Sequence, residues 1–500
     1  MKRRGDGDEV RAKERSTISP LEQELGVSGR SRRQWMVASA AVVAGSVVAC
    51  GDSGDGGTDA SACAADGTAP ATLPSFGSER CTNEIDSSPL PPDESRFTAW
   101  NQELRSQAGG RESAFVDLDA LDHNMKLVGS QLGSRIALRL VAKSLPSVRL
   151  LEYMMVTACT NRIMAFSEGM VRDLLCRFGA DVDILLGRPA AAAAAGRIFA
   201  TLDAQSSGDA NPAGGVRWLV DTPERLAAYR DLAEQRGSTL RIAVEIDVGL
   251  RRGGALDRDE LLAMLSIIDD SSLLQFTGFM GYDGHVPFAP EGADPAREFA
   301  EVQLRYADFV QAGSDAFPAL FDGPLVYNGG GSRTYHLYTD QLQTPINEVA
   351  MGSAFSYPFH FADLPEQALR RATFLASPVL KRIDPAEIPF ARGLLPAMSQ
   401  TNSDLQVAFY QVAAGFPGEH VFPEGLVPNP AIPGSEGVNN LLSNQAEWLG
   451  SREVALQVGD FIFYHPWEGD SVRWLSRLDV LRGGKLVDQW GTFQPGIRWV

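Results

Sequence analysis

Two hydrophobic patterns alternate through the central part of the chain. Apolar runs typical of buried strands, such as residues 136–142 and 240–246, are each followed by a segment with apolar residues at helical spacing. About eight such strand–helix units follow one another, the number that forms a (β/α)8 barrel of roughly 250 residues. We therefore predict a TIM-type barrel over residues 113–372, with a doubly wound parallel sheet as the alternative.

The pattern changes at residue 373. From there on, short apolar or alternating runs lie between glycine and proline turns, and helical spacing is lost. Such runs indicate strands, and the sequence RGGK at residues 482–485 predicts a hairpin turn. We expect residues 373–500 to form a separate C-terminal β domain.

The N-terminal part lacks the pattern of a folded core. Residues 50–92 are rich in Gly, Ala, Ser, Asp and Pro, which predicts a flexible tether. Before them, residues 36–49 are uncharged and too few for the about 20 residues that cross a bilayer. Because arginines precede this short apolar run, residues 1–49 are predicted to be a signal peptide, with a merely basic tail as the alternative.

Two short motifs specify the predicted signal further. SRRQWM, with Arg32 and Arg33, resembles the twin-arginine export signature, whose pathway carries folded proteins. VVAC resembles a bacterial lipobox, in which the cysteine is lipidated and becomes the mature N-terminus. The resemblance implies an exported, periplasmic or cell-envelope protein that is anchored to a membrane by a lipid on Cys50.

Composition narrows the classes of partner. The chain is 44% hydrophobic and 22% charged, as in ordinary soluble domains. Its net charge of −18 disfavours nucleic-acid binding, because phosphate contacts need clustered Lys and Arg, so a small-molecule substrate is expected. Of the five cysteines, Cys63 and Cys81 could form a disulfide or remain free thiols, and Cys159 and Cys176 show no metal-ligand spacing.

A lysine ends one of the apolar strand candidates. Lys143 follows residues 136–142, beside the face where barrel enzymes carry their active sites. Its apolar neighbours Val141, Ala142 and Leu145 would remove the amine from water, lower its pKa and favour Schiff-base formation. An ordinary surface lysine is the alternative reading.

Glycines and polar residues end other strand candidates. Residues 329–332 (GGGS) and 352–353 (GS) together could cradle a phosphate, because glycine lets backbone N–H groups approach an anion and serine adds a hydroxyl; two tight turns are the alternative. Further polar groups end two more strands, and one ligand in a barrel touches several strand ends. These groups are Glu245, Asp247 and Arg252, then Tyr282, Asp283 and His285.

Taken in order, these motifs resemble the fold type III pyridoxal-phosphate enzymes. The resemblance covers about residues 113–495 and is closest to the D-threonine aldolase and D-serine dehydratase branch, less so to alanine racemase proper. It rests on a β domain after the barrel and on the motifs FVDLDALDHN, R-x-x-x-K-S, DILLG-x-P, EIDVG-x-x-R-x-G, GY-x-GH, GGGS and E-x-x-x-GS.

This resemblance implies a site, a cofactor and a reaction. Pyridoxal 5'-phosphate would be held by Lys143, Arg139, Arg252, Tyr282, Gly330, Gly331, Ser332, Gly352 and Ser353, with Lys143, Tyr282 and His285 as catalytic residues. The implied activity is that of a lyase on D-configured β-hydroxy amino acids, by Cα–Cβ cleavage or by elimination. An amino-acid racemase and a non-catalytic ligand-binding lipoprotein are the alternatives. The resemblance also implies a homodimer in which the neighbour's β domain completes each site.

The sequence departs from this family at the metal ligands. Members carry His-x-Asp or His-x-Cys after a proline, whereas YHPWEGDSV places Glu468 and Asp470 there, with His465 before the proline. Two carboxylates suit Mg²⁺ or Mn²⁺ better than zinc. Because no third ligand is identifiable, we expect a solvated acidic turn, with a divalent metal as the alternative. The histidine that usually follows the arginine is also missing, because Val141 occupies that position.

Overall fold

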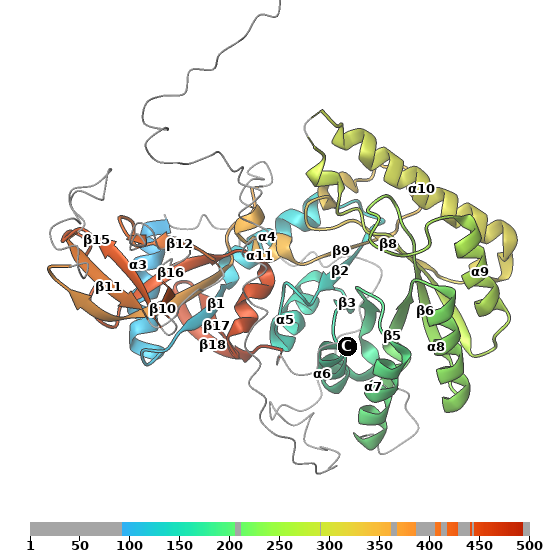
Figure 1. The fold of residues 1–500 in the computed structure, drawn as a ribbon, viewed down its shortest axis with the longest axis horizontal. Helices are drawn as coiled ribbons and strands as arrows, with labels where there is room; N and C mark the ends of the chain where they lie inside the picture. The colour runs from blue at the N-terminus through green and yellow to red at the C-terminus, as the bar shows by residue number, and fades with distance from the viewer. Residues whose placement is uncertain are drawn as a thin grey trace, which may run out of the picture. The chain divides into compact units, whose positions relative to one another are not determined.

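The fold is described from a computed structural model in which two parts are defined, a closed barrel and a separate sheet (Figure 1). The predicted signal peptide, Cys50 and the tether with Cys63 and Cys81 lie outside the described residues. Among the described helices, none combines the length and the apolar character needed to cross a bilayer. The structure describes residues 93–205, 212–290, 292–361, 368–386, 406–411, 418–428, 441–442 and 445–493.

Parallel strands close the barrel in sequence order, and β2 pairs with β9 to complete it. This arrangement confirms the predicted (β/α)8 barrel and excludes the doubly wound sheet. The strands are β2 (Ala137–Val141), β3 (Arg162–Ala165), β4 (Asp183–Leu186), β5 (Val216–Val220), β6 (Leu240–Glu245), β7 (Leu274–Met280), β8 (Val326–Gly329) and β9 (Glu348–Met351). The helices between them are α5 (Val148–Ala158), α6 (Glu168–Phe178), α7 (Ala192–Gln205), α8 (Pro223–Arg236), α9 (Arg258–Asp269) and α10 (Pro295–Ala316).

The barrel helices begin at residues that suit a helix start. Ser147, Ser167, Thr222 and Asp257 each accept a hydrogen bond from a backbone N–H of the first turn of α5, α6, α8 and α9. Such a cap contributes about 1 kcal/mol by satisfying a donor that the helix leaves free. Each cap therefore fixes the residue at which the chain leaves a loop and begins the next barrel helix.

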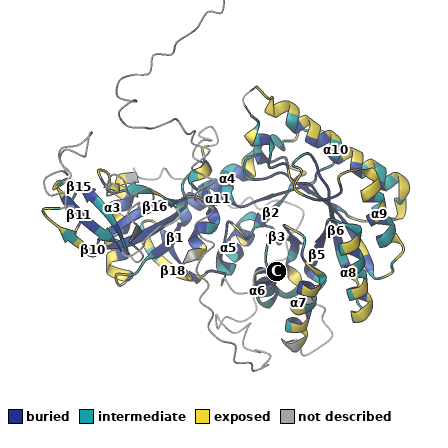
Figure 2. Ribbon diagram, in the orientation of Figure 1, coloured by how far each residue is buried: buried dark blue, intermediate teal, exposed yellow. Residues whose placement is uncertain are grey.

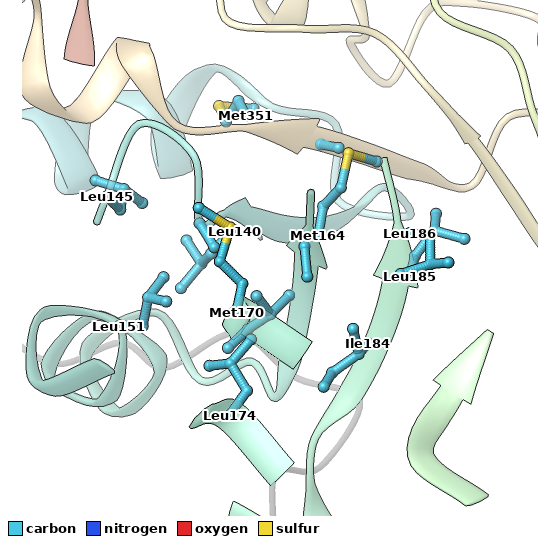
Figure 3. Close-up of a cluster of buried hydrophobic side chains, with 14 of the residues drawn as sticks. Leu140, Leu145, Leu151, Met164, Met170, Leu174, Ile184, Leu185, Leu186 and Met351 are labelled. Atoms are coloured by element: carbon cyan, nitrogen blue, oxygen red, sulfur yellow. The ribbon is translucent and has the colours of Figure 1, made fainter. Parts of the chain in front are cut away.

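Apolar side chains between strands and helices form the core. Figure 3 shows Leu140 of β2, Met164 of β3 and Ile184 of β4 near Leu151 of α5 and Leu174 of α6. Fully burying a side chain of this kind contributes about 1.5–3 kcal/mol. Figure 2 shows the barrel strands mostly buried, whereas α9 and α10 keep one exposed side, as their amphipathic sequences predict.

The second part is a mixed sheet built mainly from the C-terminal residues. At its end, Gly483 and Gly484 have positive φ and form the hairpin turn between β17 and β18, as RGGK predicts. The C-terminal strands are β10 (Thr373–Ile383), β11 (Val407–Gln411), β12 (Gly418–Phe422), β13 (Val427–Pro428), β14 (Leu441–Leu442), β15 (Gln445–Gly450), β16 (Phe461–Pro466), β17 (Arg477–Arg482) and β18 (Lys485–Gly491).

One strand corrects the predicted start of the barrel. β1 (Ser113–Asp117) pairs with β10 and β17 in the second sheet, and α4 (Leu118–Gln131) then leads to β2, the first barrel strand. The helix α3 (Asp93–Gln107), which the sequence pattern did not predict, also packs on this sheet through Trp100 against Phe115. The β domain therefore takes its strands from both sides of the barrel sequence.

Candidate active site

A cavity of about 300 Å³ lies at the carboxyl ends of the barrel strands. This size is at the lower end of small-molecule pockets, which measure about 300–1,000 Å³. The lining comes from the strand ends, the loops that follow them and one residue of the β domain. It consists of Val141, Lys143, Ser144, Met164, Phe166, Gly187, Arg252, Met280, Tyr282, Phe288, Asn328, Gly330, Gly331, Ser332, Arg333, Ala350, Met351, Gly352, Ser353, Phe361 and Glu468.

Lys143 lies in the turn directly after β2 and lines the cavity. Its neighbours Ala142 and Leu145 are fully buried, but Lys143 itself is exposed. The expected removal of its amine from water is therefore wrong. The turn directs the apolar neighbours into the core and the lysine into the cavity, where its amine can reach a ligand.

The two glycine–serine loops lie together beside the lysine turn. Ser332 Oγ accepts a hydrogen bond from the Gly352 N–H at 3.2 Å, which joins the loops after β8 and β9. The Ser353 and Ser144 hydroxyls are 2.9 Å apart, which joins the second loop to the lysine turn. The predicted combination of Lys143 with both loops is thus present in one cavity.

The glycines in these loops cannot carry a side chain without displacing a neighbour. A Cβ on Gly330, whose φ is +64°, would lie 2.9 Å from Val349 Cγ1. A Cβ on Gly352 would lie 2.8 Å from the Val141 carbonyl oxygen. Glycine is therefore required for the close approach of these loops to their neighbours, and backbone without side chains is the surface that an anion can approach closely.

Tyr282 and Arg252 form another wall. The Arg252 guanidinium carbon is 5.0 Å from the centroid of the Tyr282 ring, a cation–π distance. Although Tyr282 is 38% exposed, partial burial raises the pKa of its phenol, the Asp283 carboxylate adds to this, and Arg252 opposes it. The phenol therefore stays protonated at neutral pH and can donate a hydrogen bond into the cavity.

Asp283 ties the loop after β7 to the segment after the glycines. Its carboxylate accepts hydrogen bonds from Thr334 Oγ1 at 3.0 Å and from the Tyr338 hydroxyl at 2.9 Å. Burial raises the pKa of Asp283 to about 6, although both hydrogen bonds lower it. Asp283 does not line the cavity, so it positions Tyr282 and the glycine loop.

Other residues predicted at these strand ends lie outside the cavity lining. Glu245 and Asp247 are buried, and burial, followed by the charge of Asp221, raises the pKa of Glu245 to about 7. His285 packs against Gly249, where a Cβ would lie 2.9 Å from His285 Nε2. The structure does not bring His285 together with Lys143, because its loop directs the ring toward the loop after β6.

Arg139, predicted to hold the cofactor, lies inside the barrel and does not line the cavity. It is fully buried and donates to both carboxylate oxygens of Glu348, at 2.6 and 2.9 Å, and to Asp183 at 3.3 Å. Burial alone would raise the pKa of Glu348, but the Arg139 guanidinium holds it below its ordinary value. Four residues before Lys143, the arginine still lies within β2, so its side chain enters the barrel rather than the loop face.

Asn328, which is not among the predicted site residues, connects that buried cluster to the cavity. The residue lines the cavity, and its Nδ2 donates to Glu348 Oε1 at 2.8 Å. Its only sequence signal is its place just before the glycines of the loop after β8. Ser144 and Arg333, which directly follow Lys143 and Ser332, also line the cavity without having been predicted to.

The two candidate metal ligands point to different partners. Glu468 lines the cavity, and its Oε1 is 2.9 Å from His360 Nδ1. Asp470 lies in a short 3₁₀ helix and pairs with Arg473 at 3.6 Å. His465 is buried, its Nε2 lies 2.6 Å from the Tyr357 carbonyl oxygen, and burial lowers its pKa to about 4.

Within the described ranges, no three His, Cys, Asp or Glu residues are grouped to hold a metal ion. A cation between Glu468 and Asp470 would also lie close to the Arg473 guanidinium, which opposes it electrostatically. The donor set found here therefore does not fit a divalent metal, and we derive no step through one.

The residues present fit pyridoxal phosphate. Lys143 offers an exposed amine for an aldehyde, and the backbone and hydroxyl groups of the two loops suit a phosphate. Tyr282 with Arg252 gives a flat, partly cationic wall for an aromatic ring. A closed barrel with such a site is the architecture of fold type III pyridoxal-phosphate enzymes.

Comparison with known families agrees with this class. Residues 116–356 match the family model described as alanine racemase, N-terminal domain. The barrel of this chain is therefore similar to the alanine racemase N-terminal domain family, whose cofactor is pyridoxal 5'-phosphate. No curated protein matches the sequence.

Several solved structures share the fold at low sequence identity. D-threonine aldolase from Filomicrobium marinum is 16% identical, with a TM-score of 0.55 over 76% of this chain and 93% of its own. D-threo-3-hydroxyaspartate dehydratase from Delftia sp. HT23 is 17% identical, with a TM-score of 0.53 over 76% and 96%. Alanine racemase of Clostridium difficile 630 is 12% identical, with a TM-score of 0.55 over 76% and 97%. At these identities the likeness establishes the fold alone.

Proposed function

We propose that this protein is a pyridoxal-phosphate-dependent lyase that acts on D-configured β-hydroxy amino acids. The observation that carries the proposal is the presence of Glu468, oriented by His360, in the same cavity as Lys143 and the glycine–serine loops. A carboxylate there can take the proton of a substrate hydroxyl, which neither racemisation nor simple binding requires. The activities named for the aldolase and dehydratase of similar fold support this substrate class.

The cofactor would be held by residues with separate tasks. Lys143 would bind its aldehyde carbon, and Gly330, Gly331, Ser332, Gly352 and Ser353 would bind its phosphate through N–H and hydroxyl groups. When bound, pyridoxal phosphate withdraws electrons from the substrate Cα, so that a bond to that carbon can break. Arg252 and Tyr282 would face its ring.

The protein would then decide which bond breaks by placing its proton acceptors. Glu468 would take the β-hydroxyl proton as the Cα–Cβ bond breaks, releasing an aldehyde, and a proton delivered to Cα would complete glycine. In an elimination, a base would take the Cα proton and the β-hydroxyl would leave as water. Hydrolysis of the resulting imine would then give a 2-oxo acid and ammonia. His360 keeps the Glu468 carboxylate in place through its Nδ1 contact.

An amino-acid racemase is the second candidate. Racemisation needs two acid–base groups at one Cα, and Tyr282 lines the same cavity as Lys143. A cofactor-binding lipoprotein without turnover is the non-enzymatic alternative, because a fold alone does not establish catalysis.

Product analysis separates these candidates. The holoprotein is incubated with a panel of D- and L-amino acids, with and without EDTA, and the products are identified by chiral chromatography and mass spectrometry. Glycine with an aldehyde identifies an aldolase, a 2-oxo acid identifies a dehydratase, and the opposite enantiomer alone identifies a racemase. The proposal predicts one of the first two, unchanged by EDTA; a protein that binds the cofactor and is inert to the whole panel would contradict it.

We further propose that the protein is exported in folded form, anchored at Cys50 and active as a homodimer. Arg32 and Arg33 fit a route for folded proteins, since the cofactor is acquired in the cytoplasm before export. The disulfide bonds of Cys159 and Cys176 support an oxidising location, because disulfides are rare in the reducing cytosol. Replacing Arg32 and Arg33 by lysine should block export; unchanged export would favour the general secretory route.

A further inference from the structure

Arg333 occupies a position in the cavity that the proposed reaction has not used. It directly follows Ser332 of the phosphate-binding loop, and its side chain lines the cavity. Its guanidinium carbon is 5.0 Å from the ring centroid of Phe288 and 4.6 Å from that of Phe361. Both rings also line the cavity. Such contacts over ring faces fix the plane of a guanidinium and leave its N–H groups directed outward along its edges.

The tip of Arg333 lies at the wall that carries Glu468. Its Nη2 donates to the His360 carbonyl oxygen, and the His360 ring contacts Glu468. The side chain thus reaches from the phosphate-binding loop to the segment beside the proposed base. The positive charge of Arg333 also acts on Tyr282, because it opposes the rise in the pKa of the Tyr282 phenol that burial causes.

An amino-acid substrate needs a fixed cation in this cavity. Once its nitrogen is engaged at the cofactor, its remaining ionised group is the α-carboxylate. Among the described residues, the cationic side chains that line the cavity are Lys143, Arg252 and Arg333. Lys143 is committed to the cofactor and Arg252 lies over the Tyr282 ring, whereas Arg333 reaches the carbonyl oxygen of His360, the residue whose ring contacts Glu468. A guanidinium fork matches a carboxylate with two parallel hydrogen bonds.

We propose that Arg333 binds the α-carboxylate of the amino-acid substrate and thereby places the substrate β-carbon near Glu468. This inference rests on the proposed function. The competing role is binding of the cofactor phosphate, which the adjacent Ser332 suggests. The contact with His360 favours the substrate, because it holds the guanidinium at the far end of its side chain from the phosphate-binding loop.

The experiment compares binding of D-alanine with that of D-alaninamide to the holoprotein by calorimetry. D-alanine lacks the β-hydroxyl that a lyase consumes, and the amide lacks only the negative charge. The variants are Arg333→Gln and Arg333→Lys. The control is Arg258→Gln, which changes an exposed arginine paired with Asp308 outside the cavity lining. Circular dichroism and the affinity for pyridoxal phosphate are measured for each protein.

The wild type and the control should bind D-alanine more tightly than the amide. In Arg333→Gln, D-alanine affinity should fall about 10- to 100-fold and the preference should disappear, because charge-assisted hydrogen bonds are lost, while cofactor affinity is kept. The D-alanine affinity of Arg333→Lys should lie between those of the wild type and Arg333→Gln, since lysine keeps the charge without the planar fork. An unchanged preference in Arg333→Gln, or a loss of cofactor affinity alone, would overturn the proposal. Binding is read without turnover, so a wild type that shows the preference yet converts no amino acid contradicts the proposed function and not this inference.

Discussion

Arg139 and Glu348 form a buried ion pair inside the barrel, with Arg139 Nε 2.6 Å from Glu348 Oε1. The pair joins β2, which ends before Lys143, to β9, which ends before the loop of Gly352 and Ser353. Its register places Arg139 opposite Ala350 and Leu140 opposite Met351. A pair within the barrel thus fixes the relative height of the lysine turn and one phosphate-binding loop.

Removing one member of this pair should destabilise the protein strongly. In Glu348→Leu, Arg139 keeps its charge without its main partner, which typically costs about 3–5 kcal/mol. Urea unfolding measures the loss. Asp384→Asn, which breaks an exposed pair with Arg452, is the control and should change stability far less, because exposed ion pairs contribute little. Equal effects of the two variants would contradict the role given to the buried pair.

Disulfide bonding should contribute measurably to stability. Cys159, at the end of α5, and Cys176, in α6, are both disulfide-bonded. A disulfide bond typically contributes about 2–4 kcal/mol. We expect the double variant Cys159→Ser/Cys176→Ser to lose this amount of unfolding free energy, measured with urea. A reductant should lower the unfolding free energy of the wild type only. A reductant effect of equal size in the double variant would exclude the bond as its cause.

Asp283 should make stability depend on pH. Burial raises its folded pKa to about 6, above the ordinary aspartate value of 3.8. A folded pKa above the unfolded one means that its contribution is fully present below about pH 4 and is lost as pH rises through about 6. The contribution to the unfolding free energy that is lost corresponds to about 3 kcal/mol.

Unfolding free energies of wild type and Asp283→Asn, measured between pH 4 and 7, check this. The difference between the two proteins should change across that window, since only the wild type carries the titrating group. Asp308→Asn, at an exposed position, provides the matched control. A constant difference between wild type and Asp283→Asn would show that the carboxyl does not titrate there.

Glu468 should affect turnover more than cofactor binding. Glu468→Gln keeps the size of the side chain and removes its basicity, so kcat should fall about 10²- to 10⁴-fold. The affinity for pyridoxal phosphate should change little. Asp470→Asn, two residues away and outside the cavity lining, should keep near-normal kcat. If both variants lose activity equally, Glu468 is not the proton acceptor.

Gly352→Ala should weaken cofactor binding. Its Cβ would lie 2.8 Å from the Val141 carbonyl oxygen and 3.0 Å from Ser144 Cβ, so the loop must move away from the lysine turn. We expect an affinity for pyridoxal phosphate about 10-fold lower, a loss of the size of one hydrogen bond. Gly323→Ala is the control, because a Cβ there meets nothing within 4 Å. Unchanged affinity in Gly352→Ala would show that this loop does not bind the cofactor.

The barrel and much of its site could be predicted from the sequence because both depend on local pattern. Alternating apolar runs indicate the strands, and the lysine and glycines follow strand ends directly. The placement of β1 could not be predicted in this way, because all five of its residues are buried and such a run fits either sheet. Sheet membership depends on pairing with β10 and β17, hundreds of residues away.

The direction of individual side chains could not be predicted from the sequence either. Arg139 and His285 lie close in sequence to Lys143 and Tyr282, but one side chain enters the barrel and the other packs on a neighbouring loop. Asn328 and Arg333 line the cavity as single polar residues within a glycine loop, where no periodic pattern marks them. Their roles depend on contacts with Glu348 and His360 that only the folded chain creates.

The most direct test of the account compares the wild type with Lys143→Ala. Both proteins are saturated with pyridoxal phosphate and incubated with D-threonine and D-serine, and the rates of formation of aldehyde, glycine and 2-oxo acid are measured. We expect product from the wild type and a rate at least about 10³-fold lower in Lys143→Ala, because the amine that binds the cofactor is gone. A normal rate in Lys143→Ala would contradict it.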